Sequence, residues 1–236
     1  MTPLLSAFYF GSVEHYRLLA THPKVIIDVG EHYMRQSYRT RTRIIGPNGP
    51  QDLCVHIAHD HGKKMPMHQV GLSYAETWRE QQLHAIRTAY GKAPWTLHFI
   101  DAITELLSRK YDRLIDLDLA SMRLGMEWLG LRTEVVVREN YVEFASGGRQ
   151  AVSKNAGPRT AAPRPGPDLH DLRTSFHPKR PLPPKVTAVA PYPQVFADRH
   201  GFVSRASVID LVCNTGPEAV RALGVGPYLI AGPLKV

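Results

Sequence analysis

Hydrophobic and polar positions at the start of the chain follow the pattern of a strand, a helix and a second strand. Residues 4–10 form an apolar run, and the apolar positions of residues 13–19 recur at the spacing of an amphipathic helix. Residues 24–28 are a β-branched run of the kind that is buried on both faces of a parallel sheet. Elements in this order make a right-handed βαβ unit. The pattern predicts an α/β fold with a Rossmann-like, mostly parallel sheet.

Two further strands are predicted after this unit. Residues 41–45 and 51–57 are separated by a segment, residues 46–50, that is rich in glycine and proline and contains an Asn-Gly pair. Such a segment between two strand patterns is typical of a hairpin. We therefore expect an added β-hairpin, followed by a basic, histidine-rich loop over residues 58–68.

The middle of the chain has the apolar periodicity of helices. Ser73 and Glu76 have the spacing of a capping box, which predicts a helix over residues 74–90. Two more helices are expected over residues 95–107 and 114–129. We expect the aromatic and methionine side chains of these helices to belong to the hydrophobic core.

The last part of the chain combines short elements with a long loop. Ten of the nineteen prolines lie between residues 151 and 193, where the apolar periodicity disappears. This composition predicts a long loop over residues 146–193, in the position of a lid over the site. The other expected elements are strands at residues 133–138, paired with residues 141–144, and at residues 192–196, and helices at residues 208–213 and 218–223.

We expect a single domain over all 236 residues. Its parts are an α/β core with the hairpin (1–72), a helical subregion (73–130), the long loop (146–193) and C-terminal helices (194–236).

Composition narrows the classes of function. The formal net charge of +8 and the pI near 9.6 favour an anionic partner, such as a nucleotide-sugar, a thioester or a nucleotide. A hydrophobic content of 43% is typical of a globular protein, and no apolar run is long enough to span a bilayer. Because there is no signal-peptide pattern and two cysteines are too few for a disulfide framework, we expect a cytoplasmic protein.

The densest group of chemically capable side chains follows the second predicted strand. Open α/β sheets bind ligands at the carboxyl ends of their strands, so the site is expected here. His32 is a candidate general base, oriented by Glu31 or Asp28. Expected substrate contacts on the same stretch are Tyr33, Gln36, Tyr38 and Arg39.

Three arginines of this region would share one face of a strand. Arg39, Arg41 and Arg43 alternate with other residues, and a guanidinium group matches phosphate or carboxylate. One interpretation is an anion site, with Arg39 as the ligand contact. The other is a solvated edge strand whose charges deter aggregation.

Two other groups of polar residues are candidates for the site. His84 and Arg87 lie on one helix face, with Tyr90 one turn further, and His84 is the second candidate base. This face is either turned to the site or simply exposed to water. In the proline-rich loop, Asp171, Arg173, His177 and Lys179 indicate either a lid that brings charge to a bound anion or an insertion without a role.

No metal site or cofactor is predicted. Histidines at positions 56, 59, 61 and 68 match no firm zinc-ligand spacing.

Several motifs occur together in an order that resembles the WbqC-like family. They are Asp28-x-x-Glu31-His32-Tyr33-x-x-Gln36-Ser37-Tyr38-Arg39 with Asn48-Gly49-Pro50, His84-Ala-Ile-Arg87-x-x-Tyr90, Asp171-Leu-Arg173 with Phe176-His177-Pro-Lys179, and Tyr192-x-Gln194 with Ile209-Asp210-Leu211. The sequence departs from the family pattern at Arg205-Ala206, where Asn-Leu is usual, so Arg205 is not among the predicted site residues.

The resemblance implies a function. The family is found in bacterial surface-polysaccharide (O-antigen) gene clusters, with a suggested role in transferring glycine or a similar acyl group to a sugar. It implies that Arg39, Arg87 and Arg173 hold an anionic donor or nucleotide-sugar, with Asn48 and Tyr90 as further substrate contacts.

Two alternative functions are left open. An adenylate-forming ligase would bind ATP near Gly11-Ser-Val-Glu-His15, which resembles the strand-to-helix histidine motif of nucleotidyltransferase-like proteins. A basic nucleic-acid-binding module would also explain the net positive charge, although the sequence has no motif of that class. The oligomeric state is not predicted.

Overall fold

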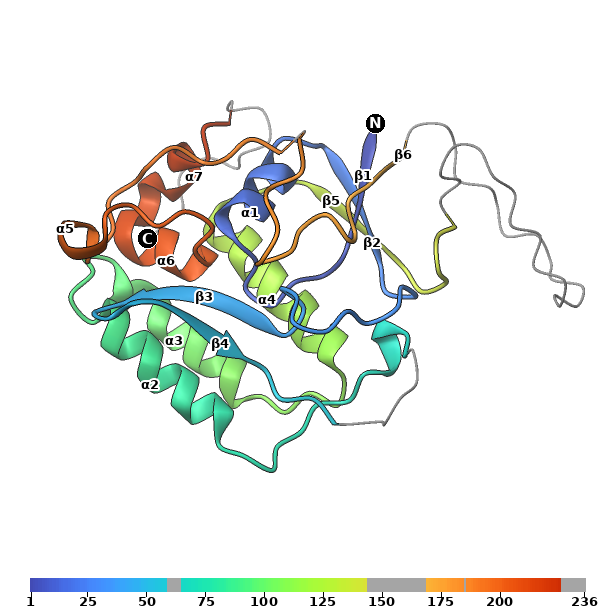
Figure 1. The fold of residues 1–236 in the computed structure, drawn as a ribbon, viewed down its shortest axis with the longest axis horizontal. Coiled ribbons are helices and arrows are strands. Elements are labelled where there is room, and N and C mark those ends of the chain that lie inside the picture. The colour runs from blue at the N-terminus through green and yellow to red at the C-terminus, as the bar shows by residue number, and fades with distance from the viewer. Residues whose placement is uncertain (59–64, 144–168, 185, 226–236) are drawn as a thin grey trace, which may run out of the picture.

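A parallel sheet of four strands lies at the centre of the computed structural model, which describes residues 1–58, 65–143, 169–184 and 186–225 (Figure 1). The strand order is β5-β2-β1-β6, and every neighbouring pair is parallel. The strands are β1 (Thr2–Leu5), β2 (Lys24–Asp28), β5 (Glu134–Arg138) and β6 (Leu169–Asp171). The α/β fold predicted from the sequence is confirmed.

The first βαβ unit forms as its pattern predicts. Helix α1 (Val13–Ala20) joins β1 to β2, and Leu4 pairs with Ile26 across the two strands. The first strand ends at Leu5, whereas the sequence predicted a strand to Phe10. Residues 6–10 are buried but do not continue the strand, because the N–H of Tyr9 donates to the carbonyl oxygen of Tyr38 and not to a neighbouring strand.

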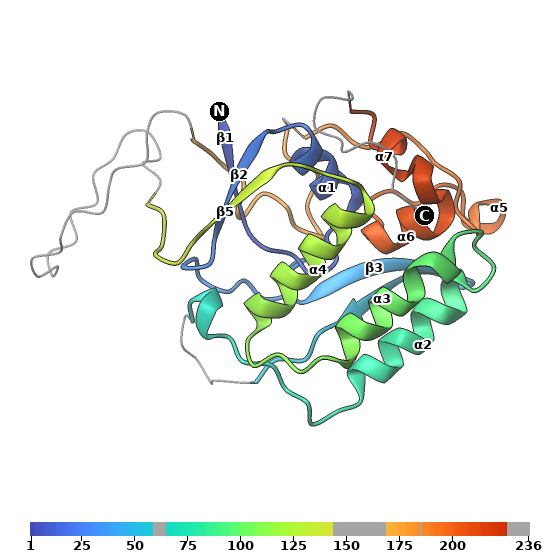
Figure 2. The same cartoon turned by 180° about the vertical axis from the view of Figure 1, so that it is seen from behind.

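The hairpin forms a separate sheet of two antiparallel strands, β3 (Arg41–Gly46) and β4 (Gly49–Cys54). Its turn is shorter than predicted, since Gly46 pairs with Gly49 and only Pro47 and Asn48 lie between them. Gly49 has φ of +103°, a conformation that side chains disfavour. Figures 1 and 2 both place the hairpin between α2 and the C-terminal helix α6, and both helices contact β3.

Three long helices form the predicted helical subregion: α2 (Trp78–Tyr90), α3 (Thr96–Ser108) and α4 (Leu114–Trp128). The helix start predicted from the capping box is wrong, because α2 begins at Trp78 and Thr77 is its N-cap residue. Ser73 is held in another arrangement: its N–H donates to the carbonyl oxygen of His56, and its own carbonyl oxygen accepts from Trp78 Nε1. Gly130, with φ of +61°, follows the end of α4.

Beyond residue 140 three predicted elements differ from the structure. Residues 141–143 do not pair with β5, because the N–H of Val142 donates to the side chain of Asp28 while β5 pairs with β2. Residues 192–196 are irregular. Strand β6, which pairs with β1, lies inside the segment predicted to be a loop. Residues 144–168 of that segment lie outside the described residues.

The remaining elements are short. They are η1 (Met67–Gln69), α5 (Ala197–His200), α6 (Val208–Thr215), η2 (Gly216–Glu218) and α7 (Ala219–Ala222). We call residues 172–184 the strap; this irregular segment follows β6. The buried apolar residues of the sheet, hairpin and helices form one hydrophobic cluster. Among the described residues, no helix combines the length and apolar character needed to cross a membrane.

Candidate functional site

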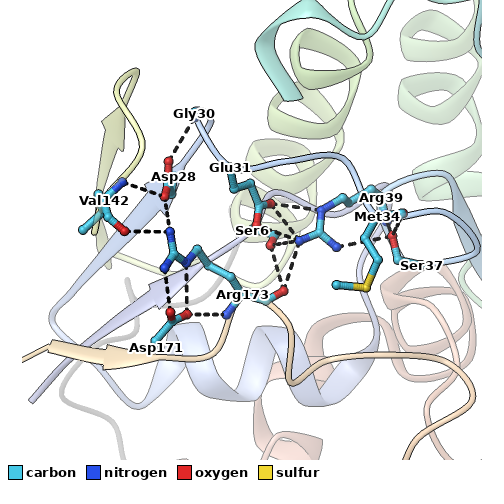
Figure 3. A network of polar contacts seen from close by, with 10 residues as sticks. All are labelled: Ser6, Asp28, Gly30, Glu31, Met34, Ser37, Arg39, Val142, Asp171 and Arg173. Carbon is cyan, nitrogen blue, oxygen red and sulfur yellow. Dashed lines mark hydrogen bonds and ion pairs between the residues drawn. The ribbon is translucent and has the colours of Figure 1, made fainter. Parts of the chain in front are cut away.

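Polar side chains gather where the strands of the parallel sheet end. Strand β1 lies between β2 and β6. The chain runs from β1 to β2 on one side of β1, and the later strand β6 pairs with β1 on its other side, so the strand order reverses at β1. Open α/β sheets bind ligands outside the carboxyl ends of the strands at such a switch point. Figure 3 shows the residues that meet here: Ser6, Asp28, Gly30, Glu31, Met34, Ser37, Arg39, Val142, Asp171 and Arg173.

Arg39 is the centre of one half of this network. Its side chain is fully buried, and its Nε and Nη2 donate to the oxygens of Glu31 at 2.8 to 2.9 Å. Nη2 also donates to Ser6 Oγ at 2.5 Å and to the carbonyl oxygen of Arg173 at 3.1 Å. Nη1 donates to Ser37 Oγ. Arg39 therefore ties the loop after β2 to the segments that follow β1 and β6.

Arg173 is the centre of the other half. Its Nε and Nη2 donate to the two oxygens of Asp171 at 3.0 and 2.6 Å. Its Nη1 donates to Asp28 Oδ2 and, at 2.9 Å, to the carbonyl oxygen of Val142. Asp28 also accepts from the N–H groups of Gly30 and Val142. Arg173 therefore ties β2, β6 and the segment after β5 together.

The charged side chains of this network pair with one another: Arg39 with Glu31, and Arg173 with Asp28 and Asp171. Burial raises the pKa of Glu31, although the guanidinium of Arg39 opposes this rise. Removing one partner from a buried ion pair leaves an uncompensated charge and costs about 3 to 5 kcal/mol. The guanidinium groups of Arg39 and Arg173, expected from the sequence to hold an anion, are directed at protein oxygens and position the loops around the site.

His32 lies at the edge of the network. Its side chain is exposed, and its ring centroid is 6.3 Å from that of Tyr141. The expected pairing with Glu31 or Asp28 is absent from the described contacts, because both carboxylates point inward to the arginines.

A group of cations lies beside this network. We define the cationic cluster as Arg41, Lys179, Arg180 and Arg205, arranged around His177. All four charges act on the imidazole of His177. Lys179 and Arg180 are exposed, and Arg41 and Arg205 are half-buried. The cluster is therefore open to solvent on one side, as a site for an anionic ligand requires.

Hydrogen bonds hold this cluster in place. Lys179 Nζ donates to Gln36 Oε1 at 2.8 Å, which joins the strap to the loop after β2. Arg205 donates from Nη2 to the carbonyl oxygen of His177 at 2.5 Å and from Nη1 to that of Arg180 at 2.6 Å. The cluster thus joins three segments that are far apart in the sequence.

His177 contributes a hydrogen-bond donor. Burial and the neighbouring cations lower its pKa, so the imidazole is neutral at pH 7. Its Nδ1 accepts the N–H of Lys179 at 3.1 Å, which leaves the ring proton on Nε2. An anion bound at the cluster would accept this N–H and favour protonation of the ring.

Three buried polar atoms near the cluster have no hydrogen-bond partner among the described residues: Glu14 Oε2, Arg41 Nε and Arg205 Nε. Glu14 Oε1 accepts the backbone N–H of Arg205, whose φ is +62°. The guanidinium of Arg205 lies 5.7 Å from the ring centre of the buried Tyr38. Buried polar groups nearly always have a partner, and a polar ligand or water at the cluster would supply one for these atoms.

The start of α1, where the ligase alternative would bind ATP, is filled by the protein. The N–H of Val13 donates to the carbonyl oxygen of Ala206, and the carbonyl oxygen of Gly11 accepts from Val208. His15 is fully buried, and a Cβ added to Gly11 would lie 2.6 Å from its Nδ1. Two main-chain groups at this helix end therefore bind the protein itself and are not free for a phosphate group.

Other predicted site residues lie elsewhere. Asn48 is exposed in the turn of the hairpin, at the opposite end of β3 from Arg41. His84 and Arg87 are exposed on α2. Tyr33 is half-buried, with its hydroxyl 3.5 Å from Thr40 Oγ1.

Tyr90 belongs to a second buried network, centred on Asp210. The carboxylate of Asp210 accepts from Tyr90 Oη at 2.9 Å, Tyr192 Oη at 2.6 Å and Gln194 Nε2 at 2.8 Å. The network joins α2 to α6 and the segment before α5. Asp210 stands within an apolar run, which is a sequence signal for a buried, partnered charge.

Ser6, Glu14 and Arg180 are not predicted from the sequence, and Arg205 is set aside because it departs from the family pattern. Ser6 and Glu14 lie in buried segments without a distinctive spacing, so no local signal marks them. Arg205 is identified only by the contacts that bring it to the strap. No three histidine, cysteine, aspartate or glutamate side chains among the described residues come together as metal ligands, and His59 and His61 lie outside those residues.

Comparison with known proteins connects these networks to a family. The model of the WbqC-like protein family matches residues 9–222, a range that contains the cationic cluster, the Asp210 network and every member of the Arg39 and Arg173 network except Ser6. Neither the curated proteins nor the solved structures contain a match to this chain. The matched range covers most of the 236 residues, and the chain belongs to the WbqC-like protein family.

Proposed function

We propose that this protein is a transferase that moves an acyl or aminoacyl group, of the glycine type, to a saccharide or nucleotide-sugar in bacterial surface-polysaccharide biosynthesis. The observation that supports it best is the cationic cluster around His177, beside the carboxyl ends of β1, β2 and β6. Family membership supports the same class of process.

The anionic donor is proposed to bind at the cationic cluster. Lys179 and Arg180 are exposed cations, and Nε2 of the neutral His177 is an N–H donor. Gln36, which accepts from Lys179, would orient that side chain. Arg39 and Arg173 are positioning residues in this proposal, because their donors already bind Glu31, Asp28 and Asp171.

The transfer step requires a base. An acceptor hydroxyl or amino group attacks the acyl carbon, its proton passes to an imidazole, and the bond from the acyl carbon to the leaving group breaks. The leaving group carries the electron pair away as an anion, which the cluster would stabilise. Of the two candidate bases, His32 is the better supported, because it lies on the loop that contributes Gln36 and Arg39, whereas His84 is exposed on α2.

A thermal-shift experiment tests the donor site. We would measure the melting temperature with UDP-N-acetylglucosamine, acetyl-coenzyme A, glycine and ATP. A ligand that binds only the folded state at about 100 times its Kd stabilises it by about 2.7 kcal/mol, which raises the melting temperature by about 5 °C or more. We expect this shift with the nucleotide-sugar or the thioester, and its loss in Lys179→Ala/Arg180→Ala.

The matched control is Lys92→Ala, which removes an exposed cation after α2 and should leave the shift unchanged. Stabilisation by ATP alone would favour the ligase, and no shift with any of the four compounds would contradict the proposal.

With the donor known, His32→Ala should lower kcat for transfer about 100-fold or more, and His84→Ala should not. Equal activity of both variants would remove the role of His32.

A further inference from the structure

Strand β5 is an outer strand of the sheet. It pairs with β2 on one side, and the described part of the chain places no strand on its other side. The N–H of Glu134 donates to the carbonyl oxygen of Pro23, and the carbonyl oxygen of Arg138 accepts from Val29, each at 2.9 Å. Main-chain groups alternate in direction along a strand. Those of Val135 and Val137 therefore point away from β2 and have no strand partner within the described ranges.

The side chains of β5 suit a partner strand. Its sequence is Glu-Val-Val-Val-Arg, with three β-branched residues in succession and no proline. Val137 is 36% exposed. Proteins usually protect such an edge with proline, lysine or a covering segment, because it readily pairs with another strand.

We propose that a second copy of this chain docks on β5, antiparallel to it, with Val136 of both copies at the two-fold axis. The two parallel sheets then form one continuous sheet. This interface is independent of the proposed transferase function.

Hydrogen-bond geometry selects this register. In an antiparallel pair, directly opposite residues exchange both of their main-chain hydrogen bonds when those groups face each other. With Val136 at the axis, Val135 lies opposite the partner's Val137, and Val137 lies opposite the partner's Val135. All the outward main-chain groups of the two valines are then paired.

Charge complementarity supports a second copy of this chain as the partner. The same register places Glu134 opposite the partner's Arg138, and Arg138 opposite the partner's Glu134. Opposite charges at facing positions stabilise a strand pair, and like charges destabilise it. Arg138 is exposed and has no carboxylate within ion-pair distance among the described residues. Glu134 binds Lys24 Nζ at 2.9 Å within its own copy, but its side chain remains 60% exposed and can face a second cation. The strand is therefore complementary to itself, as a two-fold contact requires.

Sedimentation velocity of the full chain tests the proposal. A contact of one strand is small, so we expect a monomer–dimer equilibrium between about 1 and 100 µM. Glu134→Arg places two cations opposite each other, and Arg138→Glu places two carboxylates opposite each other. Each variant alone should dimerise at least about tenfold more weakly. An equimolar mixture of the two variants places opposite charges at both positions and should restore the dimer.

Two controls separate the interface from effects on folding. Lys92→Glu makes the same change of charge as Arg138→Glu on another surface and should leave the dimer intact, and the melting temperature of each variant reports its folding. Val137→Pro removes an outward N–H without breaking the ladder with β2, so it should give a folded monomer. A monomer at all concentrations, a dimer that survives these β5 variants, or a mixture that stays monomeric would overturn the proposal.

Discussion

At the scale of single residues, burial decides what each charge does. Arg39, Arg41 and Arg43 alternate in the sequence, yet Arg39 is fully buried against Glu31, while Arg41 and Arg43 share the partly exposed Asp52. The expectation that all three share one strand face is wrong, because β3 begins at Arg41. Arg39 therefore positions the loops around it, whereas Arg41, two residues later, contributes to a solvent-facing cationic surface.

His15 is a buried residue whose titration affects stability. Burial lowers its pKa to about 3, from an ordinary value near 6.5. The unfolded chain therefore binds a proton between these two pH values that the folded chain does not bind. Stability contributed by the neutral imidazole is present above about pH 6.5 and is lost as the pH falls towards 3, by about 1.4 kcal/mol per pH unit.

We predict that His15→Leu removes this loss. Because neither ring nitrogen has a hydrogen-bond partner among the described residues, the variant sacrifices no hydrogen bond within them. Urea unfolding between pH 8 and pH 4.5 measures the effect. The free energy of unfolding of the wild type should fall more steeply with acid than that of the variant, and parallel curves would contradict the prediction.

At the scale of elements, periodicity located the three long helices and their ends to within about one residue, and the capping box before α2 is the exception. Helices α3 and α4 begin within one residue of their predicted starts, but α2 begins four residues after residue 74. A capping box is a local motif, and Ser73 instead donates its N–H to His56, a residue in another segment. At the end of α6, Gly216 lies against the ring of Trp95, so tertiary packing as well as local conformation requires glycine there.

We predict that Gly216→Ala destabilises the protein strongly. The φ of Gly216 is +52°, and an added Cβ would lie 2.2 Å from Trp95 Cδ2. Strain at this sparsely populated backbone conformation costs about 1 to 3 kcal/mol and overpacking about 1 to 3 kcal/mol, so the free energy of unfolding should fall by about 2 to 6 kcal/mol.

The matched control is Gly201→Ala, where φ is +66° and no atom lies within 4 Å of the added Cβ. It should lose only the backbone strain, about 1 to 3 kcal/mol. Urea denaturation of both variants gives the comparison. Equal losses would show that the contact with Trp95 does not decide the cost.

At the scale of the whole molecule, one hydrophobic cluster extends through the sheet, the hairpin and the helices. The single domain predicted from the sequence therefore implies a single cooperative unfolding transition. Trp78, Trp95 and Trp128 all lie in the helical subregion, so their fluorescence reports that part alone. Far-UV circular dichroism reports every helix and strand.

The urea transitions measured by these two signals should coincide. A tryptophan transition with a different midpoint would mean that the helical subregion unfolds separately and that the chain has more than one folding unit.

The sequence by itself determined the α/β class, the βαβ unit, the hairpin and the helical subregion, because each depends on the spacing of apolar residues within a short segment. It also indicated the family, and it predicts a site at the carboxyl end of β2. Only the tertiary structure decided that β6 joins the sheet and that Glu31 pairs with Arg39. It also decided that Arg205 reaches the strap. Each of these depends on contacts between segments far apart in the chain or on the direction of a buried side chain, and no local pattern encodes either.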